Sequence, residues 1–216
     1  MKFFRAKYPA IWQINVKFDP SMLLKEFERI YADRYEKIYS KNNSWKGVTI
    51  FSHGSRLELD ELPELESLAN NFGKENILGI SYFNLETNST LHEHRDMNGN
   101  LFFGVVRVHV PLKTNDQAFM FIEKVKYHLP LGTAWALDTS GLHALANGAL
   151  SNRIHLVIDI KKSPKTLEYF PDYTLSVILH LFKFSFIVSF KILRDLFSNP
   201  KSLIKRIKTL TKKYMK

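Results

Sequence analysis

Two histidines and one aspartate in the second half of the chain form the group with the clearest chemical potential. His94 and Asp96 are separated by one residue in the segment His94-Arg95-Asp96, so both side chains point to the same side of an extended segment. They can therefore bind one metal ion from adjacent positions. His143, which follows a predicted loop over residues 138–142, is the natural third ligand. Two histidines and one carboxylate are typical of non-haem Fe(II) oxygenases, because this set leaves positions open for a co-substrate and oxygen.

A repeated Arg-x-His pattern accompanies these three residues. Arg107-Val108-His109 and Arg153-Ile154-His155 both lie in strand-like runs, in which the polar pair points one way and the aliphatic residues point the other way. Burying an unpaired guanidinium is costly, so an anionic partner is implied. The planar fork of arginine suits a carboxylate, and a dicarboxylate such as 2-oxoglutarate would fit.

Each feature also has a simpler structural explanation. An isolated His-x-Asp pair more often lies in a turn or in solvent than on a metal, and His143 alone would more often be a loop or core residue. Arg107 and Arg153 could instead belong to a structural network. The carboxylates available for such a network are Asp138, Asp159 and Glu123. His92 and His128 have no compelling role and are expected to be surface or packing residues. The metal site is therefore predicted from the combination of these features in this order, and not from any one of them.

Short strands in the second half of the chain must position these residues. Between Ile77 and Ile160, apolar runs alternate with turns, and Asn98-Gly99 and Asn147-Gly148 are strong tight-turn signals. Several strands at this spacing indicate a sandwich or a small barrel. The predicted strands cover residues 78–85, 102–111, 118–124, 133–138 and 153–160.

The first third of the chain has a mixed α and β pattern. Alternation over residues 12–18 predicts a strand, and helical spacing over residues 22–31 predicts a helix capped by Ser21 or Asp19. Further predicted elements are a strand over 45–51 and a helix over 61–72. The pattern breaks at residues 160–164, where the folded core is expected to end.

Composition excludes several classes of protein. The 216 residues are 45% hydrophobic and 24% charged, which is incompatible with a collagen-like or wholly disordered chain. The absence of cysteine excludes disulfides, zinc fingers, Cys-ligated clusters and a thiol nucleophile. No sustained apolar run follows residues 1–5, so no signal peptide is expected and the cytoplasm is the default location.

Residues 80–160 resemble the aspartyl/asparaginyl β-hydroxylase family of Fe(II)/2-oxoglutarate-dependent dioxygenases. The matching parts are His94-Arg95-Asp96, residues 107–115, residues 132–138, His143, Asn147 and residues 152–159. In layout the resemblance covers residues 8–160. It implies a mainly β fold with flanking helices around a double-stranded β-helix, which is a cupin-like jelly roll.

The resemblance also implies a metal site. His94, Asp96 and His143 match iron ligands, and the cofactors would be Fe(II), 2-oxoglutarate as co-substrate and dioxygen. Asp96 matches the acidic ligand of free-amino-acid hydroxylases, whereas some protein-hydroxylating members lack it. The implied reaction is hydroxylation of an aliphatic C–H bond. The substrate would be an amino acid, a peptidyl Asp/Asn or a lipid-linked acyl group.

The remaining pocket residues follow from the same resemblance. Arg153 matches the arginine that holds the co-substrate carboxylate, and Arg107 and His109 match further polar residues of the pocket. His155, from the second Arg-x-His segment, is assigned to the same co-substrate group. Two alternatives stay open: a non-catalytic β-barrel that serves as a binding or tethering module, and a cupin-like barrel that uses another metal.

The basic charge of the chain is confined to its tail. Residues 1–160 hold 18 Lys/Arg and 18 Asp/Glu, whereas residues 161–216 hold 13 and 3, which accounts for the net charge of +10. The sequence therefore predicts a core domain over residues 1–162 and a helical basic tail over residues 163–216. Large aliphatic residues alternate with the basic ones in this tail, so nucleic acid is not expected as a partner.

The tail has the pattern of a basic amphipathic helix. Such helices favour the surface of an anionic membrane, so peripheral contact through residues 173–216, at the inner face of a membrane, is one expectation. Lys183 and Lys191 interrupt the apolar stretch, which predicts that it does not span the bilayer. The alternatives are that residues 173–197 pack against the barrel or form a dimer seam.

Overall fold

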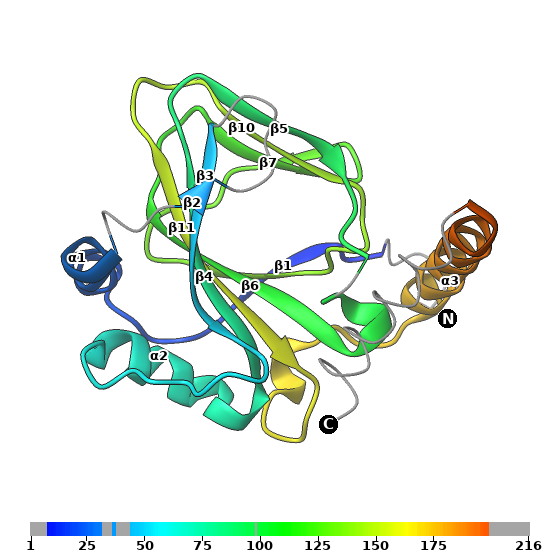
Figure 1. The fold of residues 1–216 in the computed structure, drawn as a ribbon, viewed down its shortest axis with the longest axis horizontal. Coiled ribbons are helices and arrows are strands. Elements are labelled where there is room, and N and C mark those ends of the chain that lie inside the picture. Colours follow the sequence, from blue (N-terminus) through cyan, green and yellow to red (C-terminus); the bar gives the residue numbers. More distant parts are fainter. Residues whose placement is uncertain (1–7, 32–35, 38–43, 98, 199–216) are drawn as a thin grey trace.

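The strands form two antiparallel sheets that face each other (Figure 1). The computed structural model describes residues 8–31, 36–37, 44–97 and 99–198. The larger sheet has the order β1 (Ile11–Ile14), β9 (Ala134–Leu137), β6 (Val105–Lys113), β11 (Arg153–Lys161), β4 (Ile77–Leu85), β3 (Trp45–Ser52), β2 (Glu36–Lys37). The smaller sheet has the order β5 (Ser89–His94), β10 (His143–Asn147), β7 (Ala118–Ile122), β8 (Val125–Tyr127).

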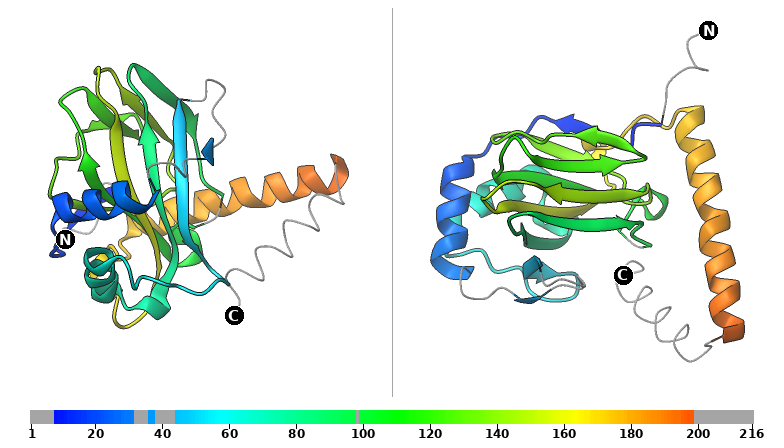
Figure 2. Two further views of the ribbon diagram at one scale, coloured as in Figure 1. Left: turned by 60° about the vertical axis from the view of Figure 1, so that its left-hand side comes forward. Right: turned by 90° about the horizontal axis from the view of Figure 1, so that it is seen from above.

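Helices flank the strands on opposite sides. The α-helices are α1 (Pro20–Tyr31), α2 (Pro63–Phe72) and α3 (Leu175–Ser198), and the short 3-10 helices are η1 (Lys74–Asn76), η2 (Leu101–Phe103) and η3 (Leu167–Tyr169). Figure 2 shows α1 and α3 at opposite sides of the strands, with the C-terminal half of α3 reaching past them. The carboxylate of Asp19 caps α1, because its Oδ1 accepts the backbone N–H groups of Ser21 at 2.8 Å and Met22 at 3.1 Å.

Apolar and polar residues alternate along the central strands β6 and β11, so the two faces of the larger sheet differ in character. The aliphatic residues of β6 and β11 pack against α1 and α2 on the outer face of the larger sheet, in one continuous core. Their fully buried members include Val106, Val108, Leu156 and Ile158. The polar residues of the same strands must then face the smaller sheet, since successive side chains of a strand point to opposite faces. A second apolar cluster fills the space between the sheets and includes Leu85, Leu91, Met120, Leu137 and Leu145.

The predicted mainly β architecture, a jelly-roll core with a C-terminal helix, is confirmed. Strands β5 and β10 were not among the predicted strands, because they are short and carry polar residues at buried positions, where a strand pattern requires apolar ones. His143 follows the predicted loop over residues 138–142, as expected, and it is the first residue of β10. The first strand also ends at Ile14 rather than at residue 18. Asn98 lies outside the described residues.

The core continues past the end predicted for it. Tyr169, Phe170 and Val177 are buried in the same cluster as the outer face of the larger sheet, so packing does not stop at residues 160–164. The division at residue 162 into a core domain and a tail stays a prediction. Helix α3 packs on the barrel through one face, as one of the alternatives for residues 173–197 required. Residues 199–216 of the predicted tail lie outside the described residues.

Most of helix α3 is apolar and lies outside the packed core. Residues Leu175–Asp195 have a mean hydropathy of 1.7, and only 11% of this window is buried. By length and composition such a helix can cross a membrane. The expectation that this stretch does not span the bilayer stays a prediction, and the contacts between α3 and the barrel bear on it.

Candidate metal centre

Pairing of β5 with β10 brings the two predicted histidine ligands together. His94 ends β5 and lies directly opposite His143, the first residue of β10, so that their ring centroids are 4.3 Å apart. Asp96 follows β5, and its backbone N–H donates to the carbonyl of Thr139 at 3.0 Å, which fixes it beside the loop before β10. The candidate ligand atoms of His94, Asp96 and His143 all lie within 4.8 Å of one another.

Backbone carbonyls orient both imidazoles for metal binding. His94 Nδ1 lies 2.8 Å from the carbonyl oxygen of His92, and His143 Nδ1 lies 3.0 Å from that of Gly141. A carbonyl only accepts, so Nδ1 carries the proton in each ring and Nε2 keeps its lone pair for a metal. Burial lowers the pKa of His143, which favours the neutral form that a metal requires. These donors fit a divalent metal such as Fe(II).

Arg107 holds the carboxylate of the triad. Its Nη1 donates to Asp96 Oδ2 at 2.6 Å, while Nε and Nη2 donate to the two oxygens of Asp159 at 2.7 and 3.0 Å. The structural network considered for Arg107 therefore exists. It also serves the site, because Arg107 orients Asp96 so that its Oδ1 faces His94, 3.8 Å from Nε2.

Arg153 has a different environment, although it lies on the same face of the sheet. It is only 2% exposed, and Nη2 lies 3.0 Å from His155 Nδ1. Within the part of the chain that the structure describes, no carboxylate lies within ion-pair distance of it. Burial lowers the pKa of Arg153 to about 9. A cation in this position needs an anion that the described residues do not supply.

Two neutral histidines complete this group. His109 Nδ1 lies 3.3 Å from His155 Nδ1, and burial together with the charge of Arg153 holds the pKa of both rings well below the usual range. Since the Arg153 guanidinium donates to Nδ1 of His155, the proton of that ring is on Nε2. This Nε2 atom is buried without a hydrogen-bond partner among the described residues.

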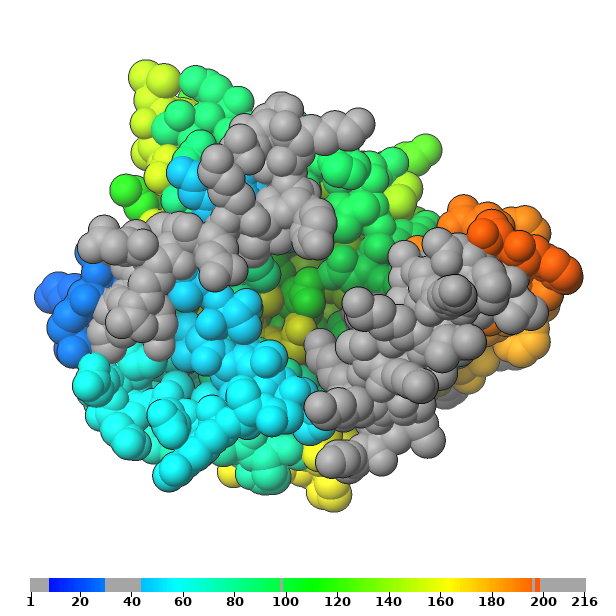
Figure 3. Space-filling model, viewed as in Figure 1, coloured from blue at the N-terminus to red at the C-terminus, as the bar shows by residue number. Residues whose placement is uncertain are grey.

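The two polar groups line one cavity of about 50 Å³ between the sheets. Its polar walls are His94, Asp96, Arg107, His109, Thr139, His143 and Arg153. Its apolar walls are Trp45, Phe83, Leu91, Met120, Leu137 and Leu145. The space-filling view is hollowed near its centre, where the cyan segment after β3 faces green parts of the chain (Figure 3). Of the seven predicted site residues, only His155 does not line the cavity; it contacts Arg153 and His109 instead.

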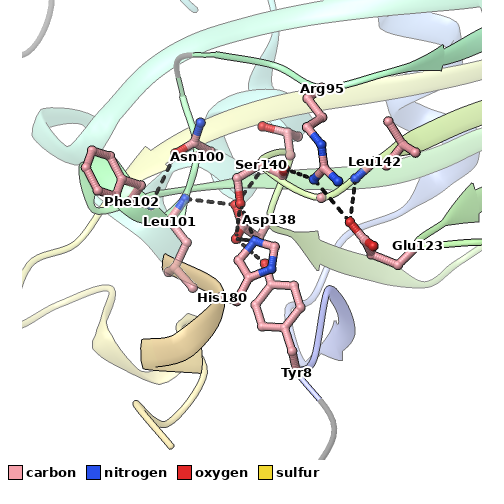
Figure 4. Close-up of polar contacts among 12 residues, drawn as sticks. Tyr8, Arg95, Asn100, Leu101, Phe102, Glu123, Asp138, Ser140, Leu142 and His180 are labelled. Atoms are coloured by element: carbon pink, nitrogen blue, oxygen red, sulfur yellow. Dashed lines mark hydrogen bonds and ion pairs between the residues drawn. The ribbon is translucent and has the colours of Figure 1, made fainter. Parts of the chain in front are cut away.

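A second polar cluster lies next to the metal centre and escaped sequence reasoning (Figure 4). It joins Tyr8, Asp138, Ser140 and His180, which come from the N-terminal segment, the loop before β10 and helix α3. No role was predicted for His180 from the sequence. No motif marks a contact across 40 residues, so spacing alone could not have found it.

Comparison with known proteins shows the family of the chain and supports its fold. The chain matches the family described as Aspartyl/Asparaginyl beta-hydroxylase over residues 16–163, more than half of its length. An oxidoreductase of the 2OG-Fe(II) oxygenase family from Burkholderia pseudomallei aligns with a TM-score of 0.52 and 14% identity, covering 71% of this chain and 86% of that one.

Two further solved structures share the fold. A prolyl hydroxylase from Trichoplax adhaerens, in complex with a hypoxia inducible factor peptide fragment, aligns with a TM-score of 0.51 and 13% identity over 75% of this chain and 86% of that one. The non-heme alpha ketoglutarate dependent epimerase SnoN from nogalamycin biosynthesis aligns with a TM-score of 0.51 and 8% identity over 71% and 76%. At these identities the likeness concerns the fold alone.

Proposed function

Because the chain belongs to the aspartyl/asparaginyl β-hydroxylase family, we propose that it is an Fe(II)/2-oxoglutarate-dependent dioxygenase that hydroxylates an aliphatic C–H bond. One observation carries the proposal. A two-histidine, one-carboxylate group and a buried arginine without an anionic partner face the same cavity. The first group suits Fe(II) with open positions, and the second suits a carboxylate.

The proposed roles follow from the contacts. His94, Asp96 and His143 would hold Fe(II), which when bound supplies the oxidative chemistry with dioxygen. Arg153 would bind a carboxylate of 2-oxoglutarate, and His155 holds its guanidinium in place. In the balanced reaction, substrate, dioxygen and 2-oxoglutarate give the hydroxylated substrate, succinate and carbon dioxide.

The other groups keep the site oriented and dry. Arg107 holds Asp96 in position for the metal. His109 is neutral and buried, so it lines the cavity near Arg153 without adding a further positive charge to those of the two arginines. The apolar walls exclude water, which strengthens every charged contact inside the cavity.

The substrate is one of three classes: an amino acid, a peptidyl Asp/Asn or a lipid-linked acyl group. The prolyl hydroxylase of the same fold is bound to a peptide, which is compatible with the second class. The third class requires the barrel to lie at a membrane, and the free apolar face of α3 would permit this. The proposed location is accordingly the cytoplasm, with peripheral attachment to the inner face of a membrane.

Succinate formation tests the proposal. Anaerobically purified protein, reconstituted with Fe(II) and exposed to air with ascorbate, is expected to convert 2-oxoglutarate slowly to succinate even without substrate. His143→Ala should abolish this turnover, and His128→Ala is the matched control because His128 does not line the cavity. Absence of both turnover and 2-oxoglutarate binding, measured separately by calorimetry, would refute the proposal.

A second candidate function is a non-catalytic barrel held at a membrane by its tail. The exposed apolar face of α3 is the specific observation that favours it. Such a module would need neither the metal triad nor the unpaired Arg153, and the same calorimetric titration separates the two functions. Binding of 2-oxoglutarate favours the enzyme, and its absence favours the module.

A further inference from the structure

Helix α3 carries a row of large apolar side chains that face away from the barrel. At 3.6 residues per turn they fall within an arc of about 120°. Their exposed fractions range from 42% for Leu175 to 81% for Phe197. The residues of this outer face are Leu175, Ile178, Leu179, Phe182, Phe186, Phe190, Leu193 and Phe197. Contiguous apolar surface of this kind marks an interaction site.

The opposite face of α3 is fastened to the barrel. Val177 and Phe184 are 0% and 1% exposed, and His180 Nε2 lies 2.8 Å from Ser140 Oγ. The outer face therefore cannot rotate inward to cover its own phenylalanines. A crossing orientation would draw His180 out of these contacts and into hydrocarbon, so the packed helix favours an orientation in the membrane plane.

Charge distinguishes a membrane from a second copy of the chain as the occupant. Asp195 is the single acidic residue of α3, and it pairs with Arg194 at 3.2 Å, while Lys183 is exposed beside the outer face. Residues 199–216 add seven Lys/Arg and no Asp/Glu by sequence. A dimer through α3 would bring two such segments together, whereas an anionic bilayer attracts them, at about 1 kcal/mol per basic residue.

We propose that the outer face of α3 docks in the plane of an anionic membrane surface. Its phenylalanines enter the boundary between headgroups and acyl chains. The inner face of α3 contacts the barrel beside the metal centre, where it lines a small hollow with Arg95 and Glu123. A helix that docks on the membrane therefore also holds the barrel at the surface.

Vesicle sedimentation of the full-length protein tests this proposal. The protein is expected to bind vesicles of phosphatidylcholine mixed with phosphatidylglycerol, and to bind vesicles of phosphatidylcholine alone at least roughly tenfold more weakly. Replacing Phe182, Phe186 and Phe190 together by Gln should lower binding roughly tenfold or more. Leu150→Gln is the matched control, since Leu150 is 88% exposed on a loop away from α3.

Three outcomes would overturn the proposal. The first is equal binding of the triple variant and the control. The second is a wild-type dimer, seen by light scattering without lipid, that the triple variant abolishes while neither protein binds vesicles. The third is bound protein that alkaline carbonate cannot extract and only detergent releases, because this behaviour identifies a spanning helix.

The inner face of α3 carries a second, independent inference, which rests on hydrogen bonds and on the proposed metal centre. His180 stacks on Tyr8 with ring centroids 3.7 Å apart, and its Nε2 contacts Ser140 in the loop that leads to His143. Ser140 Oγ also contacts Asp138 Oδ2 at 2.6 Å. The loop over residues 138–142 therefore contacts α3 through Ser140 (Figure 4), and it continues directly into β10, which begins with His143.

The loop is also joined to the segment of the other two ligands. Arg95, which lies between His94 and Asp96, donates to the carbonyl of Ser140 and to Glu123 Oε1, the latter at 3.1 Å. Glu123 Oε1 in turn accepts the backbone N–H of Leu142 at 2.8 Å, directly before His143. We infer that His180 is a positioning residue, which fixes the separation of His143 from His94 through this loop.

Titration with Co²⁺, as a spectroscopic probe of the metal centre, tests the inference. His180→Ala should weaken Co²⁺ binding roughly tenfold and change the visible spectrum of the bound ion, as loss of an outer contact does at other metal sites. His180→Gln should restore both, because its amide can reach Ser140. Lys183→Ala, on the same helix and lining the same hollow, is the control and should change neither.

The alternatives are separable. A purely structural role would lower the thermal midpoint of His180→Ala but leave the spectrum and affinity of bound Co²⁺ unchanged, and this result would overturn the inference. Wild-type protein that binds no Co²⁺ would instead remove the metal centre itself, and the positioning role with it.

Discussion

The two buried polar clusters of this protein differ in how completely their hydrogen bonds are made. Around Asp138, both carboxylate oxygens are occupied: Oδ1 accepts the backbone N–H groups of Leu101 and Ser140, each at 3.0 Å, and Oδ2 accepts the hydroxyls of Ser140 and Tyr8. Burial and the Asp138 carboxylate raise the pKa of Tyr8, so its hydroxyl stays a donor. The protein itself therefore supplies hydrogen-bond donors to both oxygens of Asp138, and no ligand is required.

The group around Arg153 is equally buried but incomplete. The guanidinium contacts a neutral histidine where a carboxylate is expected, and His155 Nε2 has no partner among the described residues. Burial is therefore common to both clusters and does not distinguish them. The difference lies in the missing counter-charge, which is the property expected of a site built to receive an anionic ligand.

Removing a metal ligand should have the largest effect. His94→Ala is expected to abolish Fe(II) binding and turnover, because the remaining two protein ligands cannot hold the ion, while the fold is kept since this side chain is half-buried at the end of β5. Circular dichroism and a metal titration measure the two effects. Retained full turnover would remove His94 from the ligand set, and His53→Ala, outside the cavity, is the control.

Arg153→Met sharpens the comparison because its two expected effects have opposite signs. Affinity for 2-oxoglutarate should fall roughly 100-fold, as an ion-paired carboxylate contact is lost. The unfolding free energy of the ligand-free protein should rise by about 1 kcal/mol, because an uncompensated buried charge is removed. Calorimetry and urea denaturation give the two values. A large loss of stability in the ligand-free state would show that Arg153 is already paired.

The sequence could predict the incomplete cluster but not the complete one. His94, Asp96, His143 and Arg153 belong to types and spacings that metal and carboxylate binding restrict, so local patterns identify them. The strands that carry the histidines were not predicted, because β5 and β10 are short and depend on pairing with each other rather than on their own apolar alternation.

The contacts of Asp138 and His180 illustrate what local patterns leave out. Serine, tyrosine and histidine occur on any surface, and only the packing of α3 on the barrel brings these side chains together. The same packing explains why the core runs past residue 164. The apolar tail was predicted to contact a membrane, the barrel or a second chain, and one face is now seen to contact the barrel.

Asp138→Asn tests the complete cluster. An amide cannot accept all the hydrogen bonds that the two carboxylate oxygens receive, so the unfolding free energy should fall by roughly 2 kcal/mol. Asp116→Asn, at an exposed turn, should leave it unchanged within error. Urea denaturation of the metal-free proteins measures both. An unchanged stability for Asp138→Asn would mean that the cluster, despite its complete hydrogen bonds, does not hold the loop.

The smallest effect is a pH dependence of stability that arises from the two neutral histidines beside Arg153. In the folded state burial holds the pKa of His109 and His155 well below the usual value, so below about pH 6.5 the unfolded chain binds more protons than the native protein. The unfolding free energy should therefore decrease on acidification, by at most about 1.4 kcal/mol per pH unit for each histidine. His155→Asn should reduce this slope, and His53→Asn, outside the cavity, should not. Equal slopes for the two variants would mean that His155 gains a proton in the folded protein as readily as in the unfolded chain, which a ring beside an uncompensated Arg153 cannot do.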